Sequence, residues 1–214
     1  MTGFLLKDIL VNKKYILTSL TVTACYIVFG FMSNNMSFFI PFLMLFCSMF
    51  VLSTFSYDEL AGWDMYAITM PITKKEIIYS KYILFLLLHI IAGVFSILTN
   101  ALNTILIHQP FSKDFYVEIW LFTAAALVFN CIQIPLVVKM GPEKARFAII
   151  AIILVPTLLF IGLNKLEQTE YLQRFLSGLL DHSNQLLLLS PIILLILIFF
   201  SMQISVSIFN KKEF

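Results

Sequence analysis

Residues 57–81 read YDELAGWDMYAITMPITKKEIIYSK and form the longest charged interruption in an otherwise apolar chain. Apolar runs long enough to cross a bilayer lie on both sides of this stretch. Its charges and exposed backbone could not be satisfied in lipid, so the stretch must lie in water at one face of a membrane. It therefore predicts a polytopic, all-α membrane protein with a substantial loop projecting from one face.

The loop itself predicts short helices. Ser56 and Glu59 have the spacing of a capping box, and so have Thr73 and Glu76. The first half of the loop is acidic and the second half is basic. An apolar stripe at helical spacing runs between the two capping boxes, at Leu60, Trp63, Ala67 and Met70. We expect this loop to hold a soluble partner, and an ordinary solvated loop is the alternative.

The composition of the whole chain agrees with a membrane protein. Of 214 residues, 60% are hydrophobic and 12% are charged, whereas soluble domains are about 45–50% apolar and roughly 25% charged. The net charge of +2 is too small to indicate nucleic-acid binding. Three cysteines, Cys25, Cys47 and Cys131, lie inside apolar runs without metal-ligand spacing, so neither a disulfide framework nor a metal site is expected. The first residues are too interrupted by charge for a cleavable signal peptide.

Six apolar runs are long enough to span a bilayer, which takes about 17–25 residues each. We expect one membrane domain over residues 1–214, with spans near 15–32, 37–55, 82–107, 117–138, 147–163 and 187–209. Before the first span, an apolar stripe beside charged residues predicts a short helix in the membrane interface. A frayed start of the first span explains that segment equally well.

The distribution of positive charge sets the orientation of the six spans. Eleven Lys and Arg residues fall on the face that holds both termini and the loop of residues 57–81, against three on the other face. A count of five or seven spans would destroy this segregation. We therefore expect both termini and this loop to be cytoplasmic.

The third span is predicted to begin well before the bilayer. From Lys74 to Ile107 the helical pattern runs for 34 residues without a breaker. Such a helix is about 51 Å long, against a hydrocarbon core of about 30 Å. We expect its first turns to project into the cytoplasm as a rigid lever that is continuous with the span.

Polar residues inside the spans allow two interpretations. They are His89, Asn100, Asn103, Asn130 and Gln133. Groups of this kind at membrane depth face other helices or a cavity. We favour hydrogen bonds between helices over a substrate path.

Two further segments complete the pattern. Residues 139–146 read KMGPEKAR: Gly141 and Pro142 predict a turn, and the next helix opens with Glu143, Lys144 and Arg146. We expect this second cytoplasmic loop to touch the same partner as the first. On the opposite face, residues 164–186 predict an amphipathic helix, either an external gate or a connector, whose apolar side includes Tyr171, Leu172, Phe175, Leu176 and Leu179.

The two cytoplasmic loops resemble the signature of ABC-2 type transporter permeases. The similar positions are Asp58-Glu59, Trp63-Asp64, Met70-Pro71 and Lys74-Lys75-Glu76, followed by Ser80-Lys81-Tyr82, and later Gly141 with Glu143 to Arg146. Pro142, between the glycine and the glutamate, departs from the family pattern. The resemblance covers essentially the whole chain, and within the family it is similar to the small permeases of phenol-soluble-modulin and peptide-antibiotic exporters.

This resemblance implies a function. Such a chain is the permease subunit of an exporter, paired with a second permease subunit as a homo- or heterodimer and moving amphipathic or hydrophobic substrates, with peptides as the expected class. Its first loop would dock a cytoplasmic ATPase through Asp58, Glu59, Trp63 and Asp64, and Lys74, Lys75 and Glu76 would pass motion to the third span. The ATPase, with its ATP and Mg²⁺, must be a separate chain, because no glycine here is followed by lysine as a P-loop requires.

Two other classes of function were weighed. The first is a non-transporting immunity or sensor protein that binds a toxic peptide through the outer amphipathic helix. The second is a membrane-embedded enzyme, which is disfavoured because no catalytic motif is present in the sequence. The permease interpretation therefore leads, without a cofactor, metal or catalytic site in this chain.

Overall fold

The computed structural model describes residues 2–33, 39–107, 113–164 and 183–212, and in these ranges the ordered elements are all helices. In chain order they are α1 (Thr2–Val11), α2 (Lys13–Ser33), α3 (Phe39–Leu60), α4 (Trp63–Ile68), α5 (Lys74–Ile107), α6 (Lys113–Met140), α7 (Pro142–Asn164) and α9 (Ser183–Asn210). The all-α prediction is confirmed for these residues.

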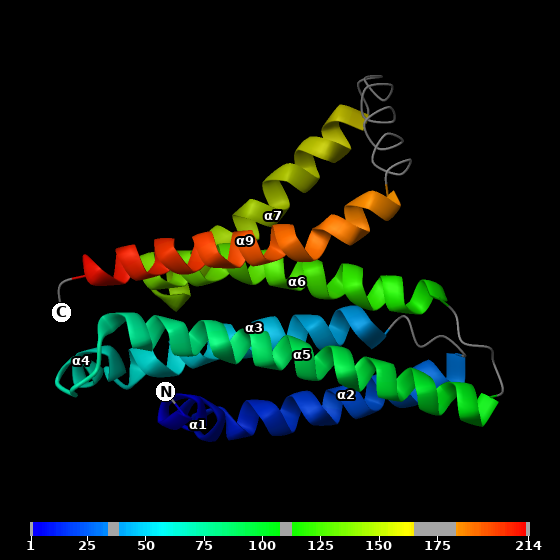
Figure 1. Ribbon diagram of the computed structural model, residues 1–214, viewed down its shortest axis with the longest axis horizontal. Coiled ribbons are helices and arrows are strands. Elements are labelled where there is room, and N and C mark those ends of the chain that lie inside the picture. The colour runs from blue at the N-terminus through cyan, green and yellow to red at the C-terminus, as the bar shows by residue number, and fades with distance from the viewer. Residues whose placement is uncertain (1, 34–38, 108–112, 165–182, 213–214) are drawn as a thin grey trace.

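The long helices lie roughly side by side as a bundle (Figure 1). The helices α3, α5, α6 and α9 make its core, α2 packs against α3, and α7 contacts α6 and α3 but diverges from the bundle along its length. We call one end of the bundle the charged end: it holds α1, α4, the start of α5, the α6–α7 turn and the end of α9. It corresponds to the face that the positive charges predict to be cytoplasmic.

The bundle core combines apolar packing with hydrogen bonds between helices. Phe85 of α5 and Ile134 of α6 are fully buried in it. The Tyr82 hydroxyl lies 2.6 Å from Ser201 Oγ and 2.9 Å from Ser205 Oγ, and thereby joins α5 to α9. Such bonds hold membrane helices together where no difference in hydrophobicity drives them to associate.

The polar residues predicted within the spans behave differently from one another. Asn130 donates from Nδ2 to Ser48 Oγ at 2.8 Å, which is the expected bond between helices. The buried His89 instead bonds the carbonyl of Phe85 in its own helix. Gln133 is buried, and neither polar atom of its side chain has a partner in the described part of the chain. The interpretation as inter-helix bonding therefore holds for Asn130 but does not account for Gln133.

Large apolar side chains cover the outside of the bundle. On α9 alone, Leu195 is 67% exposed and Phe200 is 60% exposed. Full burial of such a side chain is worth about 1.5–3 kcal/mol, so a long row of them facing water would be costly. A hydrocarbon surrounding removes this cost, which supports insertion of the bundle in a bilayer.

Four described helices are long and apolar enough to cross a membrane: Ile40–Leu60, Lys74–Ile105, Phe115–Met140 and Leu187–Asn210. They match four of the six predicted spans. The other two predicted spans correspond to α2 and α7, which are helical over 21 and 23 residues. Lys13 and Lys14 open α2, and several threonines lie inside it. The count of six spans and the interfacial placement of α1 remain predictions.

One of the two predicted capping boxes is confirmed and the other is wrong. Ahead of α5, the backbone N–H of Thr73 donates to Glu76 Oε2 at 2.8 Å, and the N–H of Glu76 donates back to Thr73 Oγ1 at 3.3 Å. Ser56 caps nothing, because α3 continues past it to Leu60 and its hydroxyl bonds the carbonyl of Leu52 one turn back. The chain breaks instead at Gly62, whose φ of 60° ends the helical path ahead of α4.

A single residue, Gly141, connects α6 to α7. Its φ is +80°, its N–H donates to the carbonyl of Val137 at 2.9 Å, and Pro142 then occupies the first position of α7. This is the usual arrangement of a left-handed glycine after one helix and a proline at the start of the next. The predicted turn is confirmed, and so is the uninterrupted 34-residue helix α5.

Gly141→Ala should destabilise the fold by about 1–2 kcal/mol, because an L-residue is strained at positive φ. The added Cβ would also meet Glu59 Oε1 at 2.9 Å, so that side chain would have to shift. The matched control is Gly93→Ala inside α5, where no atom lies within 4 Å of the new Cβ. Thermal midpoints in a mild detergent measure both variants. A Gly141 variant that melts together with the wild type and the control would contradict this account of the turn.

Candidate functional site

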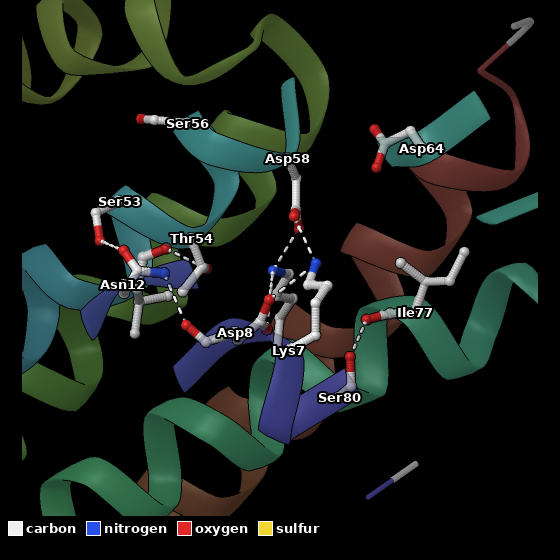
Figure 2. A network of polar contacts seen from close by, with 12 residues as sticks. Lys7, Asp8, Asn12, Ser53, Thr54, Ser56, Asp58, Asp64, Ile77 and Ser80 are labelled. Carbon is white, nitrogen blue, oxygen red and sulfur yellow. Dashed lines mark hydrogen bonds and ion pairs between the residues drawn. The ribbon is translucent and has the colours of Figure 1, made fainter. Parts of the chain in front are cut away.

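Four charged side chains from three helices meet inside the charged end; we call them the ion cluster (Figure 2). Lys81 of α5 contacts both Asp8 of α1, at 2.9 Å, and Asp58 of α3, at 2.6 Å. Lys7 of α1 completes the cluster, at 2.5 Å from Asp58 and 3.0 Å from Asp8. Two positive and two negative groups balance, so the cluster carries no net formal charge.

Three of the four side chains in the ion cluster are almost completely buried. The side chains of Lys81 and Asp8 are 3% and 2% exposed, and that of Asp58 is 10% exposed. Removing one member of a buried pair typically costs about 3–5 kcal/mol, because the remaining charge stays buried without compensation. Each of the three helices is therefore held in place by charges that the other two supply.

Local structure around Asn12 sets the position of α1 for this contact. Asn12 lies between α1 and α2, and its Nδ2 donates to the carbonyl of Asp8 at 2.9 Å. Its Oδ1 accepts from the hydroxyl of Ser53 on α3. One asparagine thus closes the end of α1 and ties it to α3, so that Asp8 faces Lys81 of α5 and Lys7 faces Asp58 of α3.

The first loop, the α6–α7 turn and the end of α9 come together beside the ion cluster. Glu59 Oε1 lies against Gly141, at 2.9 Å from the position that a Cβ would take. Asp64 of α4 lies 3.7 Å from Lys212 Nζ. Lys74 Nζ reaches the carbonyls of Asn210 and Lys212 at 3.5 and 3.3 Å. The contact of Glu59 with Gly141 brings the two loops of the sequence signature together, and the contacts of Asp64 and Lys74 join the first loop to the end of α9.

Lys74 is also favourably placed against α9. The last carbonyls of a helix carry partial negative charge, which a lysine stabilises. A cavity of about 40 Å³ lies between these elements, and its lining includes Asp58, Glu59, Lys81 and Gly141. The charged end is thus a connected structure rather than a set of separate loops.

Trp63, which opens α4, packs within the protein. Its ring lies 6.4 Å from that of Phe4 and 5.5 Å from that of Tyr66, measured between centroids. Lys7 Nζ lies over the indole at 4.4 Å, within the range of a cation–π contact. Trp63 therefore joins α4 to α1 and to the ion cluster, while remaining partly exposed.

The predicted site residues fall into three groups. Asp58 is buried in the ion cluster, and Glu76 serves the cap of α5. Trp63, Asp64 and Lys74 are half-buried in contacts within the charged end. The exposed group consists of Glu59, Lys75, Glu143, Lys144 and Arg146. The predicted outer residues Tyr171, Leu172, Phe175, Leu176 and Leu179 lie outside the described residues.

The candidate site chosen from the sequence left out the partners of Asp58. In the sequence, Lys7 and Asp8 lie beside the apolar stripe that predicts an interfacial helix, and Lys81 lies in the family signature without a predicted partner. One available signal was that Lys81 stands among apolar residues, between Ile78 and Leu84. A lysine there must reach water or find carboxylates, since buried charges need partners.

Two carboxyl groups at this end have shifted pKa values. Burial raises the pKa of Asp64 above its usual value, and Lys212 opposes that shift. The bonds from Thr73 lower the pKa of Glu76. A carboxyl whose pKa is lowered in the folded state stabilises the fold at pH values above its unfolded-state pKa. This stabilisation is lost as the pH falls through the folded-state pKa. For Asp64 the effect on stability has the opposite sign. Its pKa is raised in the folded state, so ionisation of this carboxyl destabilises the fold as the pH rises.

The described residues contain no group of three His, Cys, Asp or Glu side chains placed to hold a metal ion. What the charged end offers instead is a mechanical connection. It links exposed loop residues to the start of α5, a helix that continues across the whole bundle.

A family model described as "ABC-2 family transporter protein" matches residues 3–210. The match covers nearly the whole chain, so the protein belongs to the ABC-2 transporter family, and the resemblance drawn from the two loops is confirmed. The chain is accordingly a membrane component of an ABC transporter, a class whose permeases are not themselves catalytic. No curated protein and no solved structure matches the chain.

Lys81→Met should destabilise the protein by about 3–5 kcal/mol, because it leaves two buried carboxylates facing one remaining lysine. Adding Asp8→Asn to that variant should restore much of the loss, since charges balance again between Lys7 and Asp58. Lys75→Met, at an exposed position in the first turn of the same helix, is the control. Thermal melting of the purified chain measures all three. If Lys81→Met and Lys75→Met melt alike, the ion cluster does not hold the helices.

Proposed function

We propose that this chain is the permease subunit of an ATP-driven exporter for amphipathic or hydrophobic substrates, with peptides as the expected class. A separate ABC ATPase would bind at the charged end and supply ATP and Mg²⁺. The observation that carries the proposal is the ion cluster, which joins the loop that the sequence assigns to ATPase contact to the start of α5. This connection is what a transporter driven from outside the membrane needs.

Exposed and buried residues have different roles in this proposal. Lys75, Glu143 and Lys144 are exposed at the charged end and are free to approach a partner. Asp58 is buried and acts as a positioning residue that holds the loop to α5. Asp64 is half-buried, and burial raises its pKa. Its ion pair with Lys212 is long, at 3.7 Å. A basic residue of the ATPase would stabilise its charged form.

Motion of the loop would reach the membrane through α5. The helix has 34 residues, so at about 1.5 Å per residue it exceeds the hydrocarbon core by roughly 20 Å. Lys81 lies seven residues from its start, in the part that projects. A displacement of α4 would act on α3 and α1 through the same cluster, and the three helices would move together.

The remaining parts of the proposal concern the assembly. Two permease subunits, identical or different, would form the transport unit in the plasma membrane of a bacterium, with both termini in the cytoplasm. The excess of positive residues at the charged end supports this orientation.

Trp63→Ala should weaken ATPase binding at least ten-fold, because a partly exposed aromatic at the centre of such a loop is a typical interface hot spot. The test is co-purification in mild detergent with the ATPase encoded beside this chain, followed by ATP hydrolysis rates with and without the chain. Trp120→Ala is the control: this second tryptophan bonds Ser190 within the bundle, away from the charged end.

Both variants must first show a single melting transition, because Trp63 also packs against Phe4. A folded Trp63 variant with unchanged binding would contradict its role in docking. Failure of the wild-type chain to bind any ABC ATPase, while folded, would overturn the proposed coupling itself.

A further inference from the structure

A groove of about 420 Å³ lies between α3, α6 and α7, close to the charged end. This volume is within the range of small-molecule sites, about 300–1,000 Å³. Its walls are largely apolar and include Leu52, Phe129, Ile149 and Ile150. Four residues with polar side-chain groups interrupt the apolar wall. Tyr15 donates to the carbonyl of Phe46 and Ser53 donates to Asn12 Oδ1, so both already bond within the protein. The other two are Gln133 of α6 and Arg146 of α7.

Gln133 is the first reason to regard the groove as a binding site. Its side chain is 1% exposed, and neither Oε1 nor Nε2 has a hydrogen-bond partner in the described part of the chain. A buried amide without partners costs about 1–3 kcal/mol. A ligand in the groove with a carbonyl group would accept from Nε2 and remove part of this cost. Oε1 can accept from a hydroxyl or from a water of the headgroup layer.

Arg146 is the second reason. It is exposed, and its guanidinium donates to Ser56 Oγ at 3.1 Å. No carboxylate within residues 2–33, 39–107, 113–164 or 183–212 forms an ion pair with it, whereas Lys7 and Lys81 have two each. An arginine with open donors is well suited to a phosphate group.

The order of these groups along the bundle matches one kind of ligand. Arg146 lies five residues from the turn at Gly141, and Gln133 lies eight residues from it on the other helix. At a rise of about 1.5 Å per residue, Arg146 lies closer to the charged end and to water. Gln133 lies roughly one helical turn further into the bundle. The apolar wall lies beside both. A glycerophospholipid presents the same order: a phosphate, then ester carbonyls, then acyl chains.

We propose that this groove binds an anionic phospholipid of the leaflet at the charged end. Arg146 holds the phosphate, Gln133 Nε2 donates to an ester carbonyl, and an acyl chain lies along Leu52 and Ile149. The proposal requires only that the bundle lies in a bilayer, and it does not depend on the ATPase or on any transported substrate. It assigns a role to Gln133, whose buried amide has no partner at either atom among the residues that the structure describes.

Binding is tested by native mass spectrometry of the purified chain titrated with phosphatidylglycerol or with phosphatidylcholine of the same acyl chains. The wild type should bind phosphatidylglycerol about five-fold more tightly: both headgroups contain a phosphate, but the choline cation of phosphatidylcholine offsets its charge, so only phosphatidylglycerol presents a net negative charge to Arg146. Arg146→Gln should remove this preference. Lys144→Gln removes the same charge from an exposed position two residues away and should leave the preference intact.

Gln133→Leu distinguishes the two contacts, since both lipids carry ester carbonyls. Gln133→Leu should weaken the binding of both lipids to a similar extent, because it removes the donor to the ester carbonyl. The variant should remain folded, because the substitution removes a buried amide that has no partner among the described residues. Equal binding of the two lipids by the wild type, or an unchanged preference in Arg146→Gln, would overturn the proposal. Occupation of the groove by a second copy of the chain or by a peptide, with phosphatidylglycerol excluded, would overturn it as well.

Discussion

The relative positions of α1, α3 and α5 at the charged end depend on Lys81, a lysine that is 3% exposed and contacts two carboxylates. A charge so deeply buried requires partners of opposite sign at fixed positions. Asp8 can reach it only if α1 lies across the start of α5, and Asp58 can do so only if α3 continues beyond the bilayer. The same requirement draws Lys7 into the cluster and places it over Trp63. The arrangement of α1, α3, α4 and α5 thus follows from one electrostatic constraint.

This constraint gives the long helix α5 its functional meaning. A helix that projects from a membrane would transmit little if its first turns were free. Here those turns are joined to α1 and α3 by the ion cluster and to the end of α9 by Lys74. Glu59 connects the same region to the α6–α7 turn at Gly141. In an ABC-2 transporter protein, this is the region through which a soluble ATPase would act on the spans.

Much of this architecture follows from the sequence because it depends on local rules. The uninterrupted pattern from Lys74 to Ile107, the cap made by Thr73 and Glu76, and the turn at Gly141 and Pro142 all form as expected. The expectation of a cap at Ser56 is wrong because the apolar helix α3 simply continues through it. The ion cluster could not be foreseen, since its members are separated by up to 74 residues and only the packing of three helices brings them together. The same is true of Gln133, because the sequence does not reveal that its buried amide has no partner among the described residues.

The central claim is that α5 moves as one rigid body when the ATPase binds nucleotide. Its most direct test is the distance between spin labels placed at Lys75 and Leu102, both exposed on α5, in the chain assembled with its ATPase. The labelled variant would lack Cys25, Cys47 and Cys131. We expect a distance of about 40 Å that is the same with and without ATP, while the distance from Leu102 to Leu20 on α2 changes. An intrahelical distance that shortens with ATP, or an α5-to-α2 distance that does not respond, would contradict the account.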